Sequence, residues 1–288
     1  MIKNPDKVTN IKKTGSIKKL VKDDQSFILK NHSKSFLSKF RRTKEIRVAK
    51  NLRTKENINT PGFIDSNEKE VLFDYVDNID YVDSIDEKYI AKKLVKFNIT
   101  NIDMKRSKTA NLLDKLVDKP MAFLQRNLIR KIFSLGLIRY CKIQKVVFGL
   151  KKRQKVFDKS FLLHNDFHKN NILITENDEI YFCDLESVVK VDRWIFIDVM
   201  KFSLGRPYIR KLNKVFIKAY LEEFKNKYKK EYKNLNVHAQ VRFSLIYFLV
   251  FRIKNSKYKD SKKFLVNIVL DDKKYDKWFN EEIKPLIP

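Results

Sequence analysis

Residues with catalytic chemistry are concentrated in one stretch, residues 161–186, which reads FLLHNDFHKNNILITENDEIYFCDLE. Asp166 and Asn171 lie on one loop between apolar segments, and Asp184 follows the next apolar segment. Short apolar runs bounded by polar turns are typical of β-strands, so we expect these side chains on neighbouring loops at strand ends. Carboxylate and amide oxygens are the ligands that Mg²⁺ prefers. The stretch therefore predicts a compact site for a divalent cation.

The spacing of these residues resembles the catalytic loop of kinases, with His164-x-Asp166 followed five residues later by Asn171. In kinases this aspartate accepts a hydroxyl proton, the asparagine holds a metal, and a further aspartate completes the metal site. HNDFHKNNILI and the later CDLE resemble the aminoglycoside phosphotransferase and choline kinase group, and the lipopolysaccharide sugar kinases. The resemblance implies that Asp166 is the catalytic base and that Asn171 and Asp184 hold Mg²⁺. It also implies that His168 steadies the loop or contacts the γ-phosphate of ATP.

The sequence departs from the family pattern in three places. Asn165 and Asn170 stand where these kinases often carry glycine, which asparagine partly imitates because it tolerates left-handed backbone. Asp184 is followed by Leu and Glu where a protein kinase has Phe and Gly. No G-x-G-x-x-G occurs, and Gly15 is the only glycine in the first sixty residues. The pattern therefore argues against an ordinary protein kinase and against a glycine loop that cradles phosphates.

The family resemblance implies the protein-kinase-like fold, an α+β fold of two lobes. Residues 1–13 form a polar, basic tail that could be loose. Residues 14–77 are expected to form a small β-rich N-lobe, with a nucleotide-binding sheet and a helix. Residues 78–288 are expected to form a larger, mainly helical C-lobe with the catalytic loop and the acceptor site. Within the C-lobe, the resemblance makes Asp198 an acid that hydrogen-bonds the catalytic loop.

The predicted nucleotide site of the N-lobe begins with two β-like runs, residues 16–22 and 26–31, around a turn. Lys30 ends the second run, and the resemblance implies that it pairs with the α- and β-phosphates of ATP. An ordinary solvent-exposed lysine is the alternative, because the chain contains 49 lysines.

The remaining nucleotide-site residues lie on a helix and on the connector between the lobes. Residues 34–55 have helical periodicity, and Glu45 is nearly the only acid among them. Glu45 is either the ion-pair partner of Lys30 or a surface residue that balances Lys44 and Arg47. In the family, the backbone of the connector hydrogen-bonds the adenine edge. These connector residues are Asp74, Tyr75 and Val76.

Composition describes a globular chain of 288 residues, 43% apolar, with a net charge of +28. Such a charge favours a polyanionic partner or membrane surface, although the excess of lysine is equally typical of an AT-rich coding sequence. Two cysteines, Cys141 and Cys183, suggest neither a disulfide framework nor a zinc site. No secretory signal is recognised, and the apolar run 243–251 is too short to span a bilayer. We expect a cytoplasmic protein, with peripheral contact at the inner face of the membrane as an alternative.

The predicted activity is transfer of the γ-phosphate of ATP to a hydroxyl group. Long-range repulsion disfavours a polycationic antibiotic as acceptor, so charge and resemblance favour an anionic sugar in lipopolysaccharide or a related surface glycan. The acidic segment 78–87 keeps an aminoglycoside or choline-like acceptor open. A solvated linker is the other explanation of that segment.

Three further interpretations of the sequence remain open. A catalytically silent kinase-like binding module would not need Asp166, Asn171 and Asp184 together. A zinc site formed by His164, Asp166 and His168 lacks a fourth thiol or imidazole and leaves Asn171 unexplained. A nucleic-acid-binding protein should show a recognisable module with aromatic residues among the cations, and none is found, so no specific nucleic acid is expected.

Overall fold

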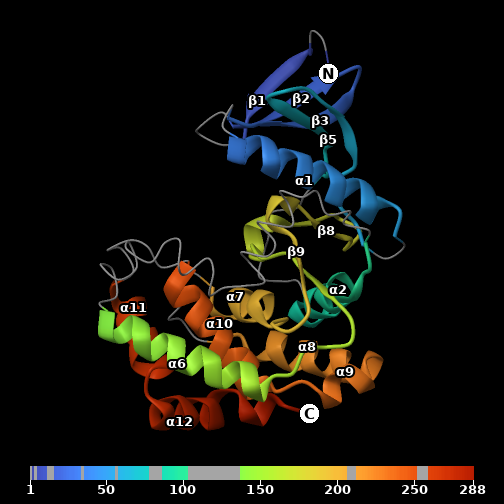
Figure 1. The fold of residues 1–288 in the computed structure, drawn as a ribbon. Helices are drawn as coiled ribbons and strands as arrows, with labels where there is room; N and C mark the ends of the chain where they lie inside the picture. Colours follow the sequence, from blue (N-terminus) through green and yellow to red (C-terminus); the bar gives the residue numbers. More distant parts are fainter. Residues whose placement is uncertain are drawn as a thin grey trace. The chain divides into compact units, whose positions relative to one another are not determined.

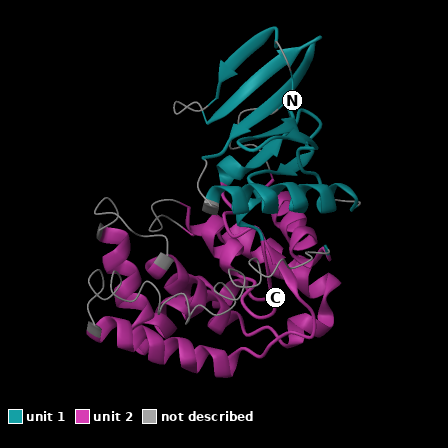
Figure 2. Cartoon of the chain, turned by 45° about the horizontal axis from the view of Figure 1, so that its top comes forward, with its two compact units in different colours: residues 1–85, 102–104, 169–188 teal, residues 86–101, 105–168, 189–288 magenta. Residues whose placement is uncertain are grey.

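The structure is a computed structural model that describes residues 2, 5–11, 16–33, 36–55, 58–77, 86–102, 137–205, 212–251 and 259–288. The chain divides into two compact units (Figure 2). The first unit comprises residues 1–85, 102–104 and 169–188, and the second comprises residues 86–101, 105–168 and 189–288. The boundary at residues 168 and 169 cuts the catalytic-loop stretch, so residues 169–188 belong with the N-terminal sheet.

The first unit is built on a five-stranded antiparallel sheet with the strand order β1-β2-β3-β5-β4 (Figure 1). Its strands are β1 (Lys7–Asn10), β2 (Ile17–Lys22), β3 (Gln25–Asn31), β4 (Phe63–Ser66) and β5 (Glu70–Asp74). Strand β1 lies in the segment that composition marked as a basic tail, and it pairs with β2. One face of the sheet is apolar, where Leu20, Leu29 and Leu72 pack together.

A two-residue turn joins β2 to β3. Lys22 pairs with Gln25, and both turn residues have left-handed backbone, with φ of 49° at Asp23 and 59° at Asp24. A turn of this kind matches the right-handed twist of the strands and therefore sets their register. The register determines which side chains share a face with Lys30, which is opposite Ile17.

Helix α1 (Phe36–Arg53) and a small hairpin complete the first unit. The buried positions of α1 recur at helical spacing, at Lys44, Glu45, Val48, Ala49 and Leu52. The hairpin follows in chain order as η1 (Lys169–Asn171), β7 (Ile172–Ile174), β8 (Ile180–Phe182) and η2 (Leu185–Ser187). Helix α1 contacts η2, at the end of the hairpin, and strand β4 of the sheet.

The second unit is mainly helical. Its elements are α2 (Glu87–Ile99), α6 (Leu137–Arg153), β6 (Phe161–Leu163), β9 (Val189–Val191), α7 (Ile197–Leu204), α8 (Lys214–Lys227), α9 (Lys229–Lys233), α10 (Val237–Phe251), α11 (Lys259–Val269), α12 (Asp272–Glu282) and η4 (Lys284–Leu286). Strands β6 and β9 pair antiparallel. A buried hydrogen-bond chain ties three of these elements together, because Tyr220 Oη donates to Asn98 Oδ1 at 2.8 Å and Asn98 Nδ2 donates to the Leu162 carbonyl at 2.7 Å.

A sheet-rich first unit and a helical second unit agree with the predicted α+β class. Residues 103–136, between α2 and α6, are outside the described residues. Gly15 and residues 78–85 of the acidic segment are also outside them.

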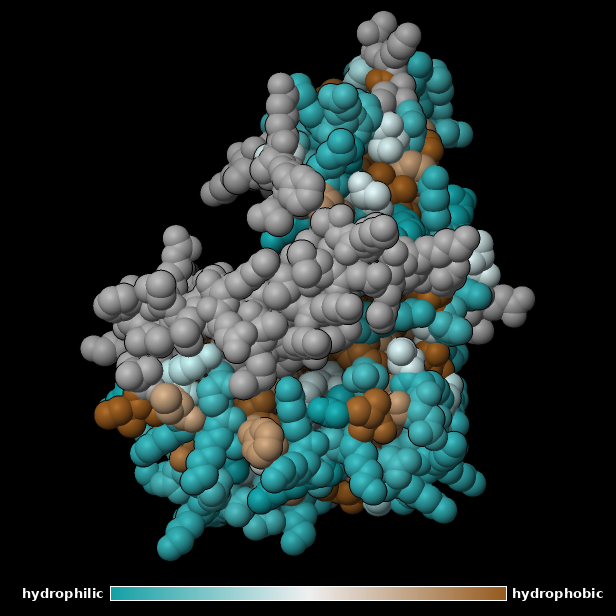
Figure 3. Space-filling view, viewed as in Figure 1, coloured by the Kyte–Doolittle hydropathy of each residue, from teal (hydrophilic) through white to brown (hydrophobic). Residues whose placement is uncertain are grey.

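The surface in Figure 3 is largely hydrophilic where it is described, with apolar residues scattered over it. None of the described helices combines the length and the apolar character needed to cross a bilayer.

Candidate functional site

Lys30 is the centre of a charge cluster in the first unit. Its Nζ lies 3.0 Å from Glu45 Oε1, 3.1 Å from Glu45 Oε2 and 2.5 Å from Asp184 Oδ1. Alternation along β3 explains the placement, because Leu29 faces the apolar cluster and Lys30 therefore points to the opposite face. The side chains of Lys30 and Glu45 are 17% and 4% exposed, so the pair is shielded from water. The structure thus brings together three residues that are 15 and 154 positions apart.

The electrostatics of the cluster keep Lys30 charged. Burial lowers the pKa of the Lys30 ammonium, but the Glu45 and Asp184 carboxylates outweigh burial and raise this pKa above its ordinary value. Burial raises the pKa of Glu45 from 4.5 to about 7, although the neighbouring Lys30 lowers it. A cation that is held by two acids keeps its charge and its position, which suits it to bind a phosphate.

Asp184 and Asn171 are placed by the β7–β8 hairpin. Ile172 pairs with Phe182, and Cys183 N donates to the Asn171 carbonyl at 3.1 Å, so Asn171 lies beside the end of β8. Asp184 then turns the chain with left-handed backbone, φ 59° and ψ 52°. Aspartate and asparagine adopt this conformation more readily than other non-glycine residues. The turn directs the chain from β8 into η2, where it meets α1.

A cavity of about 480 Å³ in the first unit collects these residues. Its polar lining includes Lys30, Glu45, Asn171 and Asp184. Its apolar lining includes Ile17, Ile28, Phe73 and Leu173. The volume falls within the range of small-molecule sites, and the combination of an apolar wall with a few convergent polar groups is typical of them.

The donor set of this cavity fits a hard cation. Asn171 and Asp184 offer an amide and a carboxylate oxygen, and Mg²⁺ is usually held by one or two carboxylates together with substrate phosphates. Among the described residues, no group of three or more His, Cys, Asp or Glu side chains is arranged to hold a metal.

The connector residues Asp74, Tyr75 and Val76 also line the cavity. Two of their backbone amides are already used, because Asp74 N donates to the Gly62 carbonyl at 2.8 Å and Tyr75 N donates to the Ser26 carbonyl at 3.3 Å. The side chain of Tyr75 is occupied as well, with Lys19 Nζ 3.7 Å from its ring centre.

Asp166 and His168 belong to the second unit. Asp166 Oδ1 contacts the ammonium of Lys201, and Asp166 Oδ2 lies 3.7 Å from His168 Nε2. The Asp166 side chain is 21% exposed, so it reaches the surface of its own unit. Lys201 lies on α7 and its side chain is only 1% exposed.

The backbone before Asp166 is fixed by Asp198, which is fully buried in the first turn of α7. Its two oxygens accept hydrogen bonds from His164 N at 2.7 Å and from Asn165 N at 2.8 Å. Asn165 has φ of 60°, as its resemblance to a glycine position suggests, and its Oδ1 accepts from Tyr247 Oη at 2.8 Å. Asn170 lies instead in the 3-10 helix η1. The His164 ring is buried and packs beside Phe97 and Phe167, with ring centres 6.0 Å apart in both cases.

Two features of the site were not found from the sequence. Thr9, Asn10 and Ile11, in and just after β1, line the cavity of the first unit. The β-branched pair Val8–Thr9 was a weak signal for a strand, hidden in a polar stretch. Lys201 contacts Asp166 across 35 positions, and the sequence offers only a lysine inside a mostly apolar helical run.

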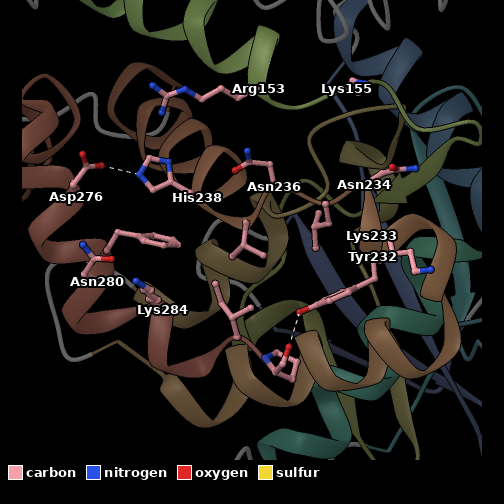
Figure 4. Close-up of a pocket in the computed structure, with 15 residues that line it drawn as sticks. Arg153, Lys155, Tyr232, Lys233, Asn234, Asn236, His238, Asp276, Asn280 and Lys284 are labelled. Atoms are coloured by element: carbon pink, nitrogen blue, oxygen red, sulfur yellow. Dashed lines mark hydrogen bonds and ion pairs between the residues drawn. The ribbon is translucent and has the colours of Figure 1, made fainter.

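A second, larger cavity of about 880 Å³ lies in the second unit (Figure 4). Residues at the end of α6, in α9 and in α12 line it, together with His238, whose Nε2 is 2.8 Å from Asp276 Oδ1. Four of its fifteen lining residues are Lys or Arg, close to the proportion in the whole chain, 63 of 288. Charge therefore does not distinguish this cavity from the rest of the chain.

Comparison with solved structures gives clear matches, while no protein-family model and no curated protein matches the chain. The streptomycin–ATP complex of the aminoglycoside phosphotransferase APH(2″)-IIa aligns with a TM-score of 0.61 and 15% identity, over 86% of this chain and 84% of that one. An ethanolamine kinase of Plasmodium vivax aligns with a TM-score of 0.63 and 13% identity, over 96% and 86%. A microcompartment-associated aminopropanol kinase aligns with a TM-score of 0.56 and 10% identity, over 97% and 94%. These similarities show the fold, which is that of the kinase-like phosphotransferases.

Proposed function

We propose that this chain is a magnesium-dependent phosphotransferase that moves the γ-phosphate of ATP to a hydroxyl group. One observation supports the proposal above all. A shielded Lys30, held by Glu45 and Asp184, lies in a cavity that Asn171 also lines. Phosphoryl transfer depends on positioning and charge neutralisation more than on covalent chemistry, so such a cluster provides much of what the reaction needs.

The nucleotide is assigned to the cavity of the first unit. Lys30 would pair with the phosphates, and the apolar wall that includes Ile28 and Leu173 would pack on the adenine ring. The amide of Val76 is the connector amide left for the adenine edge, since those of Asp74 and Tyr75 donate elsewhere. This arrangement needs no glycine loop to orient the base.

Asn171 and Asp184 would hold Mg²⁺, which, when bound, neutralises phosphate charge and orients the γ-phosphate. Asp166 would orient the acceptor hydroxyl and take its proton late in the transfer, because a loose transition state makes little demand for a strong base. Asp198 holds the backbone before Asp166, which limits the directions that the carboxylate can take. His168 lies near the other carboxylate oxygen of Asp166.

For the acceptor, we propose an anionic sugar hydroxyl, as in a lipopolysaccharide or related glycan. The net charge of +28 supports this choice, because it attracts anions and repels cations. An amine-bearing acceptor is the second candidate, because proteins of similar structure include an aminoglycoside phosphotransferase, an ethanolamine kinase and an aminopropanol kinase.

The decisive experiment measures ATP binding calorimetrically with and without Mg²⁺, and then ADP release with single acceptors. The acceptors are phosphorylated and carboxylated sugars, lipopolysaccharide fragments, ethanolamine, choline and aminoglycosides. We expect Mg²⁺-dependent ATP binding and acceptor-dependent ADP release that Asp166→Ala abolishes. Turnover that is unchanged in Asp166→Ala would show that the base is wrongly assigned. A chain that binds ATP but gives no turnover with any acceptor would instead support the silent binding module.

A further inference from the structure

Lys201 is a buried cation that the proposed reaction does not yet use. It lies in the second turn of α7, a helix whose eight residues are all buried, and its side chain is 1% exposed. Moving an ammonium group out of water is costly unless a carboxylate compensates the charge. The ammonium contacts Asp166 Oδ1, the side chain to which the base role is assigned. A simple core position would be filled better by an apolar residue, so the contact calls for a functional explanation.

The two oxygens of Asp166 have different surroundings within the second unit. Oδ1 contacts Lys201, whereas Oδ2 lies 3.7 Å from His168 Nε2, beyond the length of a hydrogen bond. The Asp166 side chain is 21% exposed and the Lys201 side chain is 1% exposed, so solvent reaches the carboxylate but not the ammonium. A ligand that approaches this unit from solvent can therefore contact Asp166 but cannot reach Lys201 without rearrangement.

Helix α7 holds the catalytic loop at two points that are three residues apart. Asp198 accepts the backbone amides of His164 and Asn165, and Lys201 contacts the side chain of Asp166. Residues at this spacing project from the same side of a helix. One rigid element thus orients both the backbone of the loop and the carboxylate that the loop carries.

We propose that Lys201 is a positioning residue for Asp166, whose contact with Oδ1 fixes the direction in which the carboxylate meets the acceptor hydroxyl. The inference rests on the proposed phosphotransferase function and adds a residue to it. The orientation of the Asp166 carboxylate matters more to the rate than its basicity, because the proton is transferred late. A direct role in binding phosphate is disfavoured by the burial of the ammonium.

The test compares Lys201→Met, which removes the charge at similar length, with Ser203→Ala on the same helix. Ser203 is buried, and its hydroxyl donates to the Val199 carbonyl, so its loss controls for general damage to α7. The readouts are the ATP dissociation constant, the rate of ADP release with the best acceptor of the panel, and the pH dependence of that rate. Lys201→Gln is a second variant in case the methionine variant does not fold.

We expect Lys201→Met to lower the maximal rate tenfold or more while ATP affinity changes less than about twofold, because the nucleotide is assigned to the first unit. We also expect the acidic limb of the pH–rate profile to move to higher pH, since the carboxylate is protonated more easily without its cation. The profile is repeated in a His168→Gln background, because His168 is a second titratable side chain beside Asp166. Ser203→Ala should leave rate and profile unchanged.

A double-mutant cycle with Asp166→Asn separates positioning from an independent role. In the Asp166→Asn background, Lys201→Met should lower the residual rate less than twofold, because the carboxylate that Lys201 positions is already absent. A wild-type rate and acidic limb in folded Lys201→Met, or an equal loss of rate in both backgrounds, would overturn the inference and leave the phosphotransferase proposal standing. A wild-type protein that neither binds nor turns over ATP would overturn both.

Discussion

At the scale of single residues, the proposed nucleotide site depends on a cation held between two acids. Lys30 forms one ion pair with Glu45, whose side chain is 4% exposed, and a second ion pair with Asp184. Removing one partner of such a shielded pair leaves a charge that water cannot solvate, whereas exposed pairs contribute little. The Lys30 cluster therefore has a role in stability as well as the role proposed in binding.

The first prediction concerns Lys30→Met. The variant leaves two carboxylates facing the phosphates without a cation, so ATP affinity should fall at least tenfold, or about 1.4 kcal/mol. Titration calorimetry with Mg²⁺ and ATP measures this change. Lys69→Met is the matched control, because Lys69 is exposed in the turn before β5 and its loss changes the net charge equally. Equal affinities for the wild type and Lys30→Met would remove Lys30 from the nucleotide site.

The second prediction concerns pH and His32, which follows β3 directly. Burial, together with the nearby charges of Lys30 and Arg42, lowers the pKa of the His32 imidazole from 6.5 to about 4. Glu45 Oε2 is 3.7 Å from His32 Nε2, too far for a hydrogen bond, and its charge is already paired with Lys30. The folded protein therefore binds this proton more weakly than the unfolded chain does.

The contribution of a neutral His32 to stability is complete above about pH 6.5 and is lost as pH falls through about 4. We expect the free energy of unfolding of the wild type to decrease relative to that of His32→Gln over this interval. Urea denaturation at several pH values measures the difference, and other titrating groups cancel because both proteins carry them. Parallel pH curves for the two proteins would show that the imidazole is not held neutral.

At the scale of elements, the end of β8 combines a backbone requirement with a proposed ligand role. Asp184 has φ of 59°, a conformation that costs a β-branched residue more than it costs Asn or Asp. Asp184→Asn should therefore keep the left-handed turn, with Lys30 still paired with Glu45, and lose Mg²⁺-dependent ATP affinity. Asp184→Val should lose both, with about 1–2 kcal/mol less stability. Chemical denaturation and ATP titration with Mg²⁺ or with EDTA separate the two effects, and equal stability of the variants would contradict the backbone argument.

Short-range patterns explain why the strands and loops that carry the candidate site residues could be predicted from the sequence. The alternation around Lys30 indicated a strand, and the polar loop between apolar runs placed Asp166, Asn171 and Asp184 at strand ends. Contacts between residues that are distant in the sequence could not be predicted. Nothing local indicates that β6 pairs with β9 while β7 pairs with β8, or that a lysine of α7 meets Asp166. These contacts depend on tertiary packing, which produces no periodic pattern of residues in the sequence.

At the scale of the whole molecule, the proposed chemistry is divided between two units with separate cores. The proposed nucleotide and Mg²⁺ ligands belong to the first unit, and the proposed base Asp166 and helix α7 belong to the second. Variants of the first group should therefore change ATP affinity, whereas variants of Asp166 and Lys201 should change the rate at saturating ATP. The division gives each class of variant its own kinetic signature.

The net charge of +28 leads to the last prediction, which distinguishes the two acceptor classes. A strongly cationic protein concentrates anionic acceptors near its surface and repels cationic ones, and salt screens both effects. Raising NaCl from about 0.1 M to about 1 M shortens the screening length from about 10 Å to about 3 Å. At saturating ATP, the KM of an anionic sugar should therefore rise several-fold, while the KM of an amine-bearing acceptor should fall or stay constant. A neutral sugar alcohol controls for non-specific effects of salt. If the best acceptor of the panel is an amine whose KM falls with salt, the anionic-glycan proposal is wrong. The positive charge of the chain would then repel the preferred acceptor, so it could not be used to argue for an anionic one.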